Sequence, residues 1–397
     1  MSTRLDVEDI VATLRGALPK DGAVGLHEPT FAGREWDYVK ECLDTEWVSS
    51  AGSFVDRFEE DLAAYTGAEH AIAVINGTAA LHVGLRVVGV EAGDEVIVPA
   101  LTFVATANAV SYLGATPHFV DSEERTLGLD PAKLHDYLEE IAEVHDGTCI
   151  NTQTGRPITA VMPMHTFGHP VDLDPLQAVC DQFHLSLVED AAESLGTRYK
   201  GEHTGHRGRC GAVSFNGNKT ITTGGGGALL TDDEALAERA RHLTTVAKQE
   251  HPWAYDHDEV GYNYRMPNLN AALGCAQLDQ MPSFLERKRT LTARYRDAFA
   301  DVGGVTVFEE PSFARSNYWL NALLLDDAVA DERDALLERA NEAGIGARPA
   351  WTLMPKLPMY EDCPRMDLSV AERLERRIVN VPSSASLAPA PHTPETA

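Results

Sequence analysis

The stretch Ala71-Ile72-Ala73-Val74-Ile75-Asn76-Gly77-Thr78-Ala79-Ala80-Leu81 decides the fold. Its first five residues form a short, continuous apolar run, which is typical of a strand buried on both faces of a sheet. Helix-like periodicity follows over Ala79–Val88, and the polar residues between the two runs predict a turn. A buried strand that passes directly into a helix is the unit from which parallel α/β sheets are built.

The same unit recurs along the chain. Six further apolar runs predict strands, at Glu95–Pro99, Pro117–Val120, Thr159–Pro163, Leu185–Glu189, Ala212–Phe215 and Ala228–Thr231. Helical periodicity fills several of the gaps, over Thr106–Tyr112, Pro131–Val144 and Pro175–Phe183. Because these gaps are long enough for the crossovers that parallel strands need, the sequence predicts an α/β fold. The large domain is expected to have a mixed, mostly parallel sheet covered by helices on both faces.

Residues beyond 283 follow a different spacing. Ser283–Val302 and Asp331–Ala343 are predicted helices, and residues 317–325 and the stretch after Gly344 are predicted to be extended. These elements predict a smaller C-terminal α+β domain at 283–383, after a large cofactor-binding domain at 25–282. Residues 1–24 are predicted to form an N-terminal helical segment, and the Pro-rich residues 384–397 a mobile tail.

The chain of 397 residues carries 33 Lys and Arg against 61 Asp and Glu, a formal net charge of −28. Such a surface repels phosphate backbones, so no nucleic-acid partner is expected. Only 8 of the basic residues are Lys. High acidity with little Lys favours a halophilic origin, because screening in a salt-rich cytosol weakens the self-repulsion and folding then strengthens as salt is added. An acidic protein from a GC-rich genome is the alternative.

Segments for export and covalent cross-links are not evident. No run approaches the roughly 18 apolar residues that a membrane span needs, and Met1–Lys20 has no signal-peptide core. The six Cys residues, at 42, 149, 180, 210, 275 and 363, include no Cys-x-x-Cys pair, so neither a metal site nor a disulfide framework is expected. The sequence predicts a cytoplasmic protein without a membrane partner.

Polar motifs follow three of the predicted strands. Asn76-Gly77-Thr78 opens a helix, and it is either a phosphate-binding helix start or a plain capped turn. Glu189-Asp190 ends a strand; the alternatives are a metal site, a helix N-cap by Asp190, or a carboxylate held against a protonated heterocyclic nitrogen. Lys219 stands in a polar turn after Ser214, as a nucleophile toward carbonyls or as a solvated loop Lys.

Together these motifs are the equipment for pyridoxal phosphate, which needs a Lys, a carboxylate on its ring nitrogen and an anion cradle. Phe103, which follows the strand Glu95–Pro99, offers an aromatic face for the ring, with core packing as the alternative. The four Gly residues at 224–227 are either part of a phosphate cradle or a tight hairpin that lets another element pack closely.

These motifs resemble those of the DegT/StrS family of sugar-nucleotide aminotransferases, a fold-type I group. The resemblance runs from about Gly25 to about Pro382 and rests on specific motifs. They are Trp47-Val48-Ser49-Ser50, Asn76-Gly77-Thr78-Ala79-Ala80-Leu81-His82, Gly93-Asp94-Glu95-Val96-Ile97-Val98-Pro99, Glu189-Asp190-Ala191-Ala192, Ser214-Phe215 with Asn218-Lys219, and Gly261-Tyr262-Asn263-Tyr264-Arg265-Met266.

The resemblance implies a role for each matching residue. Lys219 matches the Schiff-base Lys, and Asp190 matches the partner of the pyridine nitrogen. The other matches are Gly77, Thr78 and Ser214 at the phosphate, Phe103 stacked on the ring, and Glu193, where many relatives have Gln near the ring oxygen. Asn263 matches a residue that reaches the phosphate of the neighbouring subunit, which implies a homodimer with shared active sites.

Two departures from the family pattern, Glu193 and Gly225, resemble one branch of it. That branch acts on UDP-4-keto-6-deoxy-N-acetylhexosamines in pathways of the legionaminic-acid or bacillosamine type, and it also resembles this chain in the polar insertion around Asp146–Arg156. The resemblance implies transfer of an amine, with glutamate as the expected donor, to the 4-keto group. The product would be a 4-amino sugar nucleotide for a surface glycan. GDP-perosamine-type synthesis is the rival activity.

Three further residues are candidates for contact with the nucleotide sugar. His165 follows a predicted strand at its carboxyl end, with a packed core His as the alternative. Arg348 and Trp351 are candidates to close the site from the small domain, or else they pack within that domain. Lys219 opposes dehydratase chemistry, because relatives with that activity carry His at this position. A non-catalytic regulator would need a DNA-binding appendage, which 22 N-terminal residues cannot form.

Overall fold

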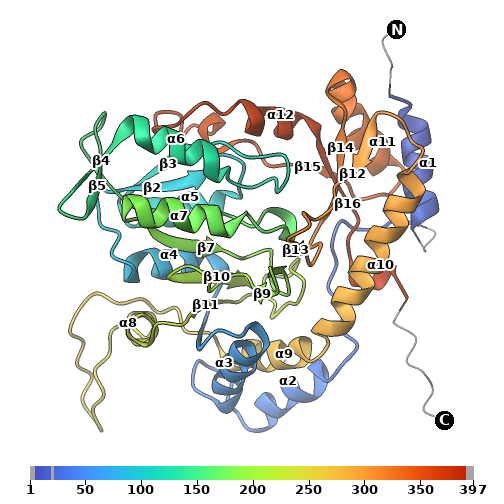
Figure 1. Cartoon of the computed structure of the whole chain (residues 1–397). Coiled ribbons are helices and arrows are strands. Elements are labelled where there is room, and N and C mark those ends of the chain that lie inside the picture. The colour runs from blue at the N-terminus through green and yellow to red at the C-terminus, as the bar shows by residue number, and fades with distance from the viewer. Residues whose placement is uncertain (1–4, 19–21, 390–397) are drawn as a thin grey trace.

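The computed structural model describes residues 5–18 and 22–389. Its main sheet has nine strands (Figure 1), and the path through seven of them runs β1-β11-β10-β7-β6-β2-β3. Their bounds are β1 His70–Val74, β2 Glu95–Pro99, β3 Thr116–Val120, β6 Pro157–Val161, β7 Ser186–Asp190, β10 Cys210–Ser214 and β11 Gly227–Thr231. Every pair from β10 to β3 along this path is parallel, and β11 is antiparallel to both neighbours. The predicted mixed, mostly parallel α/β sheet is confirmed.

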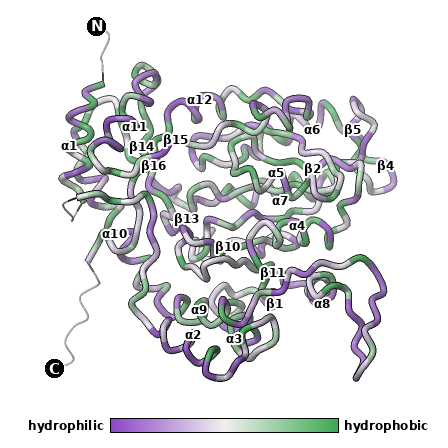
Figure 2. Tube along the Cα trace, turned by 180° about the vertical axis from the view of Figure 1, so that it is seen from behind, coloured by the Kyte–Doolittle hydropathy of each residue, from purple (hydrophilic) through white to green (hydrophobic). Residues whose placement is uncertain are grey.

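Helices cover both faces of this sheet because alternate strand residues point to opposite sides. Ile72 and Val74 pack with α4 (Gly77–Val87) and α5 (Val104–Tyr112), whereas Ala71 and Ala73 pack with α3 (Ser53–Thr66) and α9 (Asn268–Leu278). Toward the other end, α6 (Pro131–Ile141) and α7 (Leu173–Phe183) share a third cluster. Figure 2 shows hydrophobic stretches through the middle of the molecule and largely hydrophilic outer loops.

The helix predicted over Pro131–Val144 is too long. α6 ends at Ile141, and β4 (Ala142–His145) forms a hairpin with β5 (Thr148–Asn151), which joins the main sheet beside β6. The turn is Asp146-Gly147, where φ is 49° and 81°. Positive φ at both central residues is typical of the tight turn that Asp-Gly favours in hairpins, so the polar insertion is a hairpin rather than a helix end.

The sequence did not identify three helices of the large domain. These are α2 (Glu35–Asp44), α3 and α9; α9 contacts both α2 and α3, and α3 contacts β1. A fourth, α8 (Glu234–Thr244), precedes a long excursion of the chain that leaves the body of the molecule before α9 (Figure 1). The excursion matters below because of the residues it exposes.

The small domain is built on a second sheet, with strand order β12-β14-β16-β15 and antiparallel pairing throughout. Its strands are β12 Val305–Val307, β14 Asn321–Leu325, β15 Arg348–Pro349 and β16 Ile378–Val381. Its helices are α10 Met281–Phe299, α11 Arg333–Glu342 and α12 Ser369–Arg377. A third, small sheet joins the two parts, since β13 (Ala314–Arg315) pairs with β8 (Arg198–Tyr199), which pairs with β9 (Glu202–His203).

Both ends of the described chain pack into the small domain. α1 (Val7–Ala17) buries Ile10 and Leu14 in the same cluster as residues of α10, α11 and β16. The predicted mobile tail begins too early: Ala385–Leu387 is a short 3-10 helix, and Leu387 and Ala388 are buried in that cluster. Apolar Leu and Ala side chains, spaced to face the core, outweigh the Pro-rich composition here. Residues 390–397 of the predicted tail lie outside the described residues.

Two features bear on the environment of the chain. Within residues 5–18 and 22–389, no helix is long and apolar enough to cross a membrane. All six Cys residues are free, and five of them are buried.

Candidate active site

Four strand ends meet at one edge of the large sheet. β1 and β2 lead into α4 and α5, while β7 and β10 end at Asp190 and Ser214. These four strands run in the same direction, so their carboxyl ends share the edge at which such sheets bind ligands. The structure has a cavity of about 290 Å³ there. Eight residues singled out from the sequence line it: Gly77, Thr78, Phe103, Asp190, Glu193, Ser214, Lys219 and Trp351.

Asp190 is the buried carboxylate of this cavity, with 2% of its surface exposed. Thr106 Oγ1 donates a hydrogen bond of 2.7 Å to Oδ2, and the Ala192 N–H donates one of 3.1 Å to Oδ1. Residues 191–197 form turns rather than a helix, so Asp190 is not a helix N-cap. Burial raises the pKa of Asp190, although the bond from Thr106 opposes this. A cation beside this carboxylate would stabilise its charged form.

Lys219 faces the cavity, because the turn after β10 carries it back under the strand ends. Its side chain is 13% exposed, so it is not a solvated loop Lys. Nζ lies 3.3 Å from Glu193 Oε1 and 4.0 Å from the centroid of the Trp319 ring. The ring of Trp319 is fixed in turn, since its Nε1–H donates a bond of 2.7 Å to the Asn218 carbonyl. Among the described residues, Lys219 supplies the only amine of the cavity lining, and this amine is held between a carboxylate and an aromatic face.

Glu193 is buried beside Lys219 and is 3% exposed. The Phe167 N–H donates a hydrogen bond of 2.9 Å to its Oε2. Burial raises the pKa of Glu193 to about 7, against the opposing influence of Lys219. This carboxyl therefore changes its charge near neutral pH.

The start of α4 is the candidate anion site. Asn76 Oδ1 accepts a hydrogen bond of 2.8 Å from the Ala79 N–H and so caps the helix. Gly77 is required because a Cβ there would lie 2.9 Å from Ser214 Cβ. The first N–H groups of a helix have no partner within it, and Gly77, Thr78 and Ser214 all line the cavity here. A phosphate group fits at such a helix start.

In the Gly run at 224–227, the structure gives Gly227 a packing role. A Cβ at Gly227 would lie 2.5 Å from the carbonyl carbon of Asn76. Its absence lets β11 pass directly beneath the turn that begins α4. The interpretation as a tight connection that allows close packing is therefore the one the structure supports.

Aromatic side chains line the open side of the cavity. Phe103, the N-cap residue of α5, is 48% exposed, so its ring is not packed into the core. Its centroid lies 6.3 Å from that of Trp351, which in turn lies 5.0 Å from that of Phe167. A flat heterocycle between Asp190 and Lys219 would find an aromatic face in Phe103.

Three of the predicted residues lie elsewhere. His165 is buried and is not part of the cavity lining; its Nε2 bonds to Glu189 Oε2 at 2.9 Å and its Nδ1 accepts from the Val171 N–H at 3.3 Å. The packed-histidine alternative therefore describes it. Arg348 is exposed and bonds to Asn341. Asn263 is also exposed and does not line the cavity of its own chain.

Glu189, the neighbour of Asp190, has a structural task. Its carboxylate accepts backbone N–H bonds from Gly205, Arg207 and Gly208 at 2.9, 2.7 and 3.0 Å, besides the bond from His165. Burial acts to raise the pKa of Glu189, but the His165 and backbone bonds outweigh it and hold the pKa below its ordinary value. Of the acidic pair, Asp190 therefore lines the cavity, and Glu189 anchors the loop before β10.

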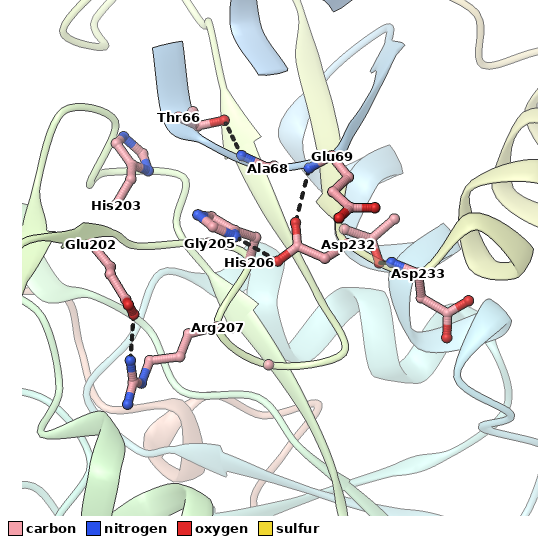
Figure 3. A network of polar contacts seen from close by, with 12 residues as sticks. Thr66, Ala68, Glu69, Glu202, His203, Gly205, His206, Arg207, Asp232 and Asp233 are labelled. Atoms are coloured by element: carbon pink, nitrogen blue, oxygen red, sulfur yellow. Dashed lines mark hydrogen bonds and ion pairs between the residues drawn. The ribbon is translucent and has the colours of Figure 1, made fainter. Parts of the chain in front are cut away.

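A larger hollow of about 970 Å³ lies at the opposite edge of the sheet, next to that loop. Its charged groups pair with one another (Figure 3): Arg207 Nη1 bonds to Glu202 at 2.6 Å, and His206 Nδ1 to Asp232 at 3.0 Å. It adjoins the amino end of β7, whereas sheets of this class bind ligands at carboxyl ends. We therefore assign the chemistry to the smaller cavity.

Several cavity residues escaped the sequence analysis. Thr106, which bonds to Asp190 from behind the lining, is the first residue of the predicted helix Thr106–Tyr112. Trp319 lies inside the predicted extended segment 317–325, and nothing local marks it. Other lining residues without a sequence prediction are Asn216, Asn218, Met164 and Leu81.

These residues fit pyridoxal phosphate. The cavity supplies an amine, a buried carboxylate that favours a neighbouring cation, a helix start for a phosphate, and an aromatic wall. The fold and the site together define a pyridoxal-phosphate-dependent aminotransferase. Comparison with known proteins narrows the class: the chain belongs to the DegT/DnrJ/EryC1/StrS aminotransferase family, whose model matches residues 29–393.

Individual relatives agree with this assignment. The chain is 38% identical over 365 residues to the GDP-perosamine synthase of Caulobacter vibrioides, covering 92% of this chain and 94% of that protein. It is 36% identical over 364 residues to the GDP-perosamine synthase of Escherichia coli O157:H7, again covering 92% and 94%. Among solved structures, DesI in the presence of its TDP-sugar product superposes with a TM-score of 0.81, at 30% identity, over 94% of this chain and 91% of that one.

The raised pKa of Glu193 gives a stability prediction for the cofactor-free protein. A carboxyl whose pKa rises from 4.5 to about 7 on folding costs stability as pH increases through that window, because the folded state binds the proton more tightly. Glu193→Gln keeps the shape of the side chain without its charge. The free energy of unfolding of the variant, relative to that of the parent protein, should therefore rise by on the order of 1–3 kcal/mol from pH 5 to pH 8. Denaturant melts at both pH values measure this.

Glu189→Gln is the matched control. The pKa of Glu189 lies below its ordinary value, so its contribution is complete above that value and constant from pH 5 to pH 8. The cost of Glu189→Gln should then be the same at both pH values. If the difference in free energy of unfolding between Glu193→Gln and the parent protein were also the same at both pH values, the raised pKa of Glu193 would be contradicted.

Proposed function

We propose that this aminotransferase transfers an amine from glutamate to the 4-keto group of a nucleotide-linked 4-keto-6-deoxy sugar, giving a 4-amino sugar nucleotide for a surface glycan. The observation that carries the proposal is the convergence of Lys219, Asp190 and the Gly77 helix start on one cavity. The relatives support the substrate class, because their names refer to nucleotide sugars.

The cavity residues divide the work. When bound, pyridoxal phosphate supplies an electron sink for the carbon that exchanges its amine. Asp190 holds the proton on the ring nitrogen, since its buried charge needs a positive partner. The α4 start and Ser214 hold the phosphate. Lys219 would hold the cofactor through its Nζ, and the same amine would move the proton between the reacting carbons as general base and acid. Trp319 and Trp351 exclude water from that amine.

Two nucleotide sugars are candidates. A UDP-4-keto-6-deoxy-N-acetylhexosamine is favoured by Glu193, by Gly225 and by the polar insertion, which resemble the branch that uses such substrates. A GDP-4-keto-6-deoxy sugar is favoured by the two GDP-perosamine synthases, which are 38% and 36% identical to this chain. We place the UDP sugar first because one of these residues, Glu193, lines the cavity.

A substrate panel separates the candidates. UDP- and GDP-linked 4-keto sugars are each incubated with the holoenzyme and glutamate, and the amino products are detected by mass spectrometry. The expected result is a kcat/KM for the UDP N-acetylhexosamine at least about tenfold above that of the GDP sugar. Preference for the GDP sugar would transfer the assignment to perosamine-type synthesis. Failure with every 4-keto sugar, with the cofactor bound, would overturn the proposed substrate class.

A homodimer with shared sites is part of the proposal. The excursion between α8 and α9 exposes Trp253, Tyr255 and Val260 by 81%, 81% and 84%. Large apolar side chains gathered on one projecting segment are typical of an interface. Asn263 stands at the return of this excursion, bridged to Thr245, and it is exposed where a second copy of the chain would meet it.

Mixed dimers give the third prediction. Lys219→Ala and Asn263→Ala homodimers should each be impaired. After subunit exchange, a hybrid carries both lesions in one site and none in the other, so a 1:1 mixture should recover about a quarter of the parent activity. Activity assays before and after exchange measure the recovery. No recovery despite exchange verified by mass spectrometry, or a fully active monomer, would contradict the shared site.

A further inference from the structure

Lys288 is a buried amine that the reaction described above does not use. It lies in α10, which runs beside the small sheet (Figure 1), and its side chain is fully buried. Its Nζ donates to the Ser383 carbonyl at 2.6 Å and to the Trp319 carbonyl at 3.1 Å, and lies 3.0 Å from His27 Nε2. An ammonium group has three donors, so each of them has an acceptor.

The burial of this amine lowers the stability of the fold. In the described part of the chain, no carboxylate lies within ion-pairing distance of Lys288, and burial lowers its pKa to about 7. Burial and the neighbouring Lys288 also hold the pKa of His27 well below its usual range, so this ring is a neutral acceptor. The His27 Nδ1 has no hydrogen-bond partner. Replacing such a group by an apolar one often improves stability, which points to a task other than stability.

That task is visible at Trp319. Lys288 holds the main-chain carbonyl of Trp319, and the indole Nε1–H holds the Asn218 carbonyl, one residue before Lys219. The Trp319 ring lies 4.0 Å from Lys219 Nζ. The residue that faces the reacting amine is thus fixed at two points, and one of them is the buried ammonium of Lys288, in the same small domain.

We propose that Lys288 is a positioning residue that sets the place of Trp319 against Lys219 and thereby aligns the reacting amine. The inference rests on the proposed role of Lys219. It predicts that loss of the ammonium shifts the Trp319 backbone and misaligns the amine, while the cofactor still binds. Misplacement by about 1 Å costs up to about 100-fold in rate.

Lys288→Met tests this, because Met fills similar space without a donor. Tyr295→Phe is the matched control: Tyr295 lies two turns further along the same buried face of α10 and bonds through its hydroxyl to the Pro382 carbonyl at 2.8 Å, next to Ser383. Each variant removes a hydrogen bond between α10 and residues 382–383, but only Lys288 also bonds to Trp319. The readouts are cofactor affinity, the visible circular dichroism per bound cofactor, and the single-turnover rate with glutamate.

The expected result is a fall of on the order of tenfold or more in the single-turnover rate of Lys288→Met, with altered circular dichroism and cofactor affinity within about threefold. Tyr295→Phe should match the parent in all three. Trp319→Phe should reproduce the Lys288→Met changes, and the double variant should be no slower than Trp319→Phe alone, because both lesions act through one residue.

Unchanged dichroism and rate in Lys288→Met, whatever its melting temperature, would overturn the proposal, as would additive losses in the double variant. If Lys288→Met does not fold, Lys288→Gln, which keeps two N–H donors on a shorter chain, decides the same question by the same readouts. Lys219→Ala distinguishes failure of the proposed role of Lys219 from failure of the positioning role of Lys288. If it still transaminates, the proposed role of Lys219 fails; if it is inactive while both Lys288 variants are normal, only the positioning role fails.

Discussion

Lys219→Ala is expected to abolish transamination, with a loss of at least about 10³-fold, because no other amine lines the cavity in the part of the chain that the structure describes. The parent holoenzyme should be yellow, and borohydride should remove the visible band by fixing the cofactor to Lys219. Peptide mapping by mass spectrometry would then find the added mass on the peptide that contains this residue. The variant should bind the cofactor without forming that band.

Lys200→Ala is the control for this experiment. Lys200 is half exposed and pairs with Asp174 at the surface, so its loss should leave rate and colour unchanged. A Lys219→Ala protein with a normal rate, or borohydride labelling at a different Lys, would show that the reacting amine lies elsewhere.

Asp190→Asn is expected to have the second-largest effect, a fall of on the order of 10³-fold in the rate of the half-reaction with glutamate. The amide keeps the shape and one acceptor for the Ala192 N–H, but it cannot balance the charge of a protonated ring nitrogen. The ring then loses its proton and its capacity to accept electrons. Stopped-flow absorbance under single-turnover conditions measures the step.

Thr106→Val serves as the comparison for Asp190→Asn. It removes the 2.7 Å bond to Oδ2 but leaves the carboxylate, so a loss of only about tenfold is expected. Equal losses in the two variants would mean that the position of the carboxylate, rather than its charge, matters at this site.

The sequence predicted the strand ends of the site because their signals are local. A buried run followed by a turn, as in Val74 to Thr78, places a residue at the carboxyl edge of a sheet without knowledge of its partners. Asp190, Ser214 and Phe103 were placed in the same way. His165 also follows a strand, but its ring bonds to Glu189 and does not line the cavity. Glu189 is held in place by a loop whose contacts the strand pattern does not predict.

The missed residues owe their roles to distant contacts. Trp319 is more than ninety positions from Lys219 in the chain, and their approach depends on how the small domain meets the large one. Lys288 reads as one more polar residue of a helix rich in Arg and Lys, and only the structure shows its three acceptors. The Asp146-Gly147 hairpin was different, since its turn signal was local and helical periodicity obscured it.

The arrangement of the chain ends has a consequence for synthesis on the ribosome. α1 is made first, yet its partners α10 and α11 begin at residues 281 and 333. At a typical elongation rate, α1 waits on the order of 10 to 50 s with its apolar face uncovered, while the large sheet is being completed. The small domain therefore assembles last and from both ends of the chain. A nascent chain released early would carry the cavity residues of the large domain without Trp319 and Lys288.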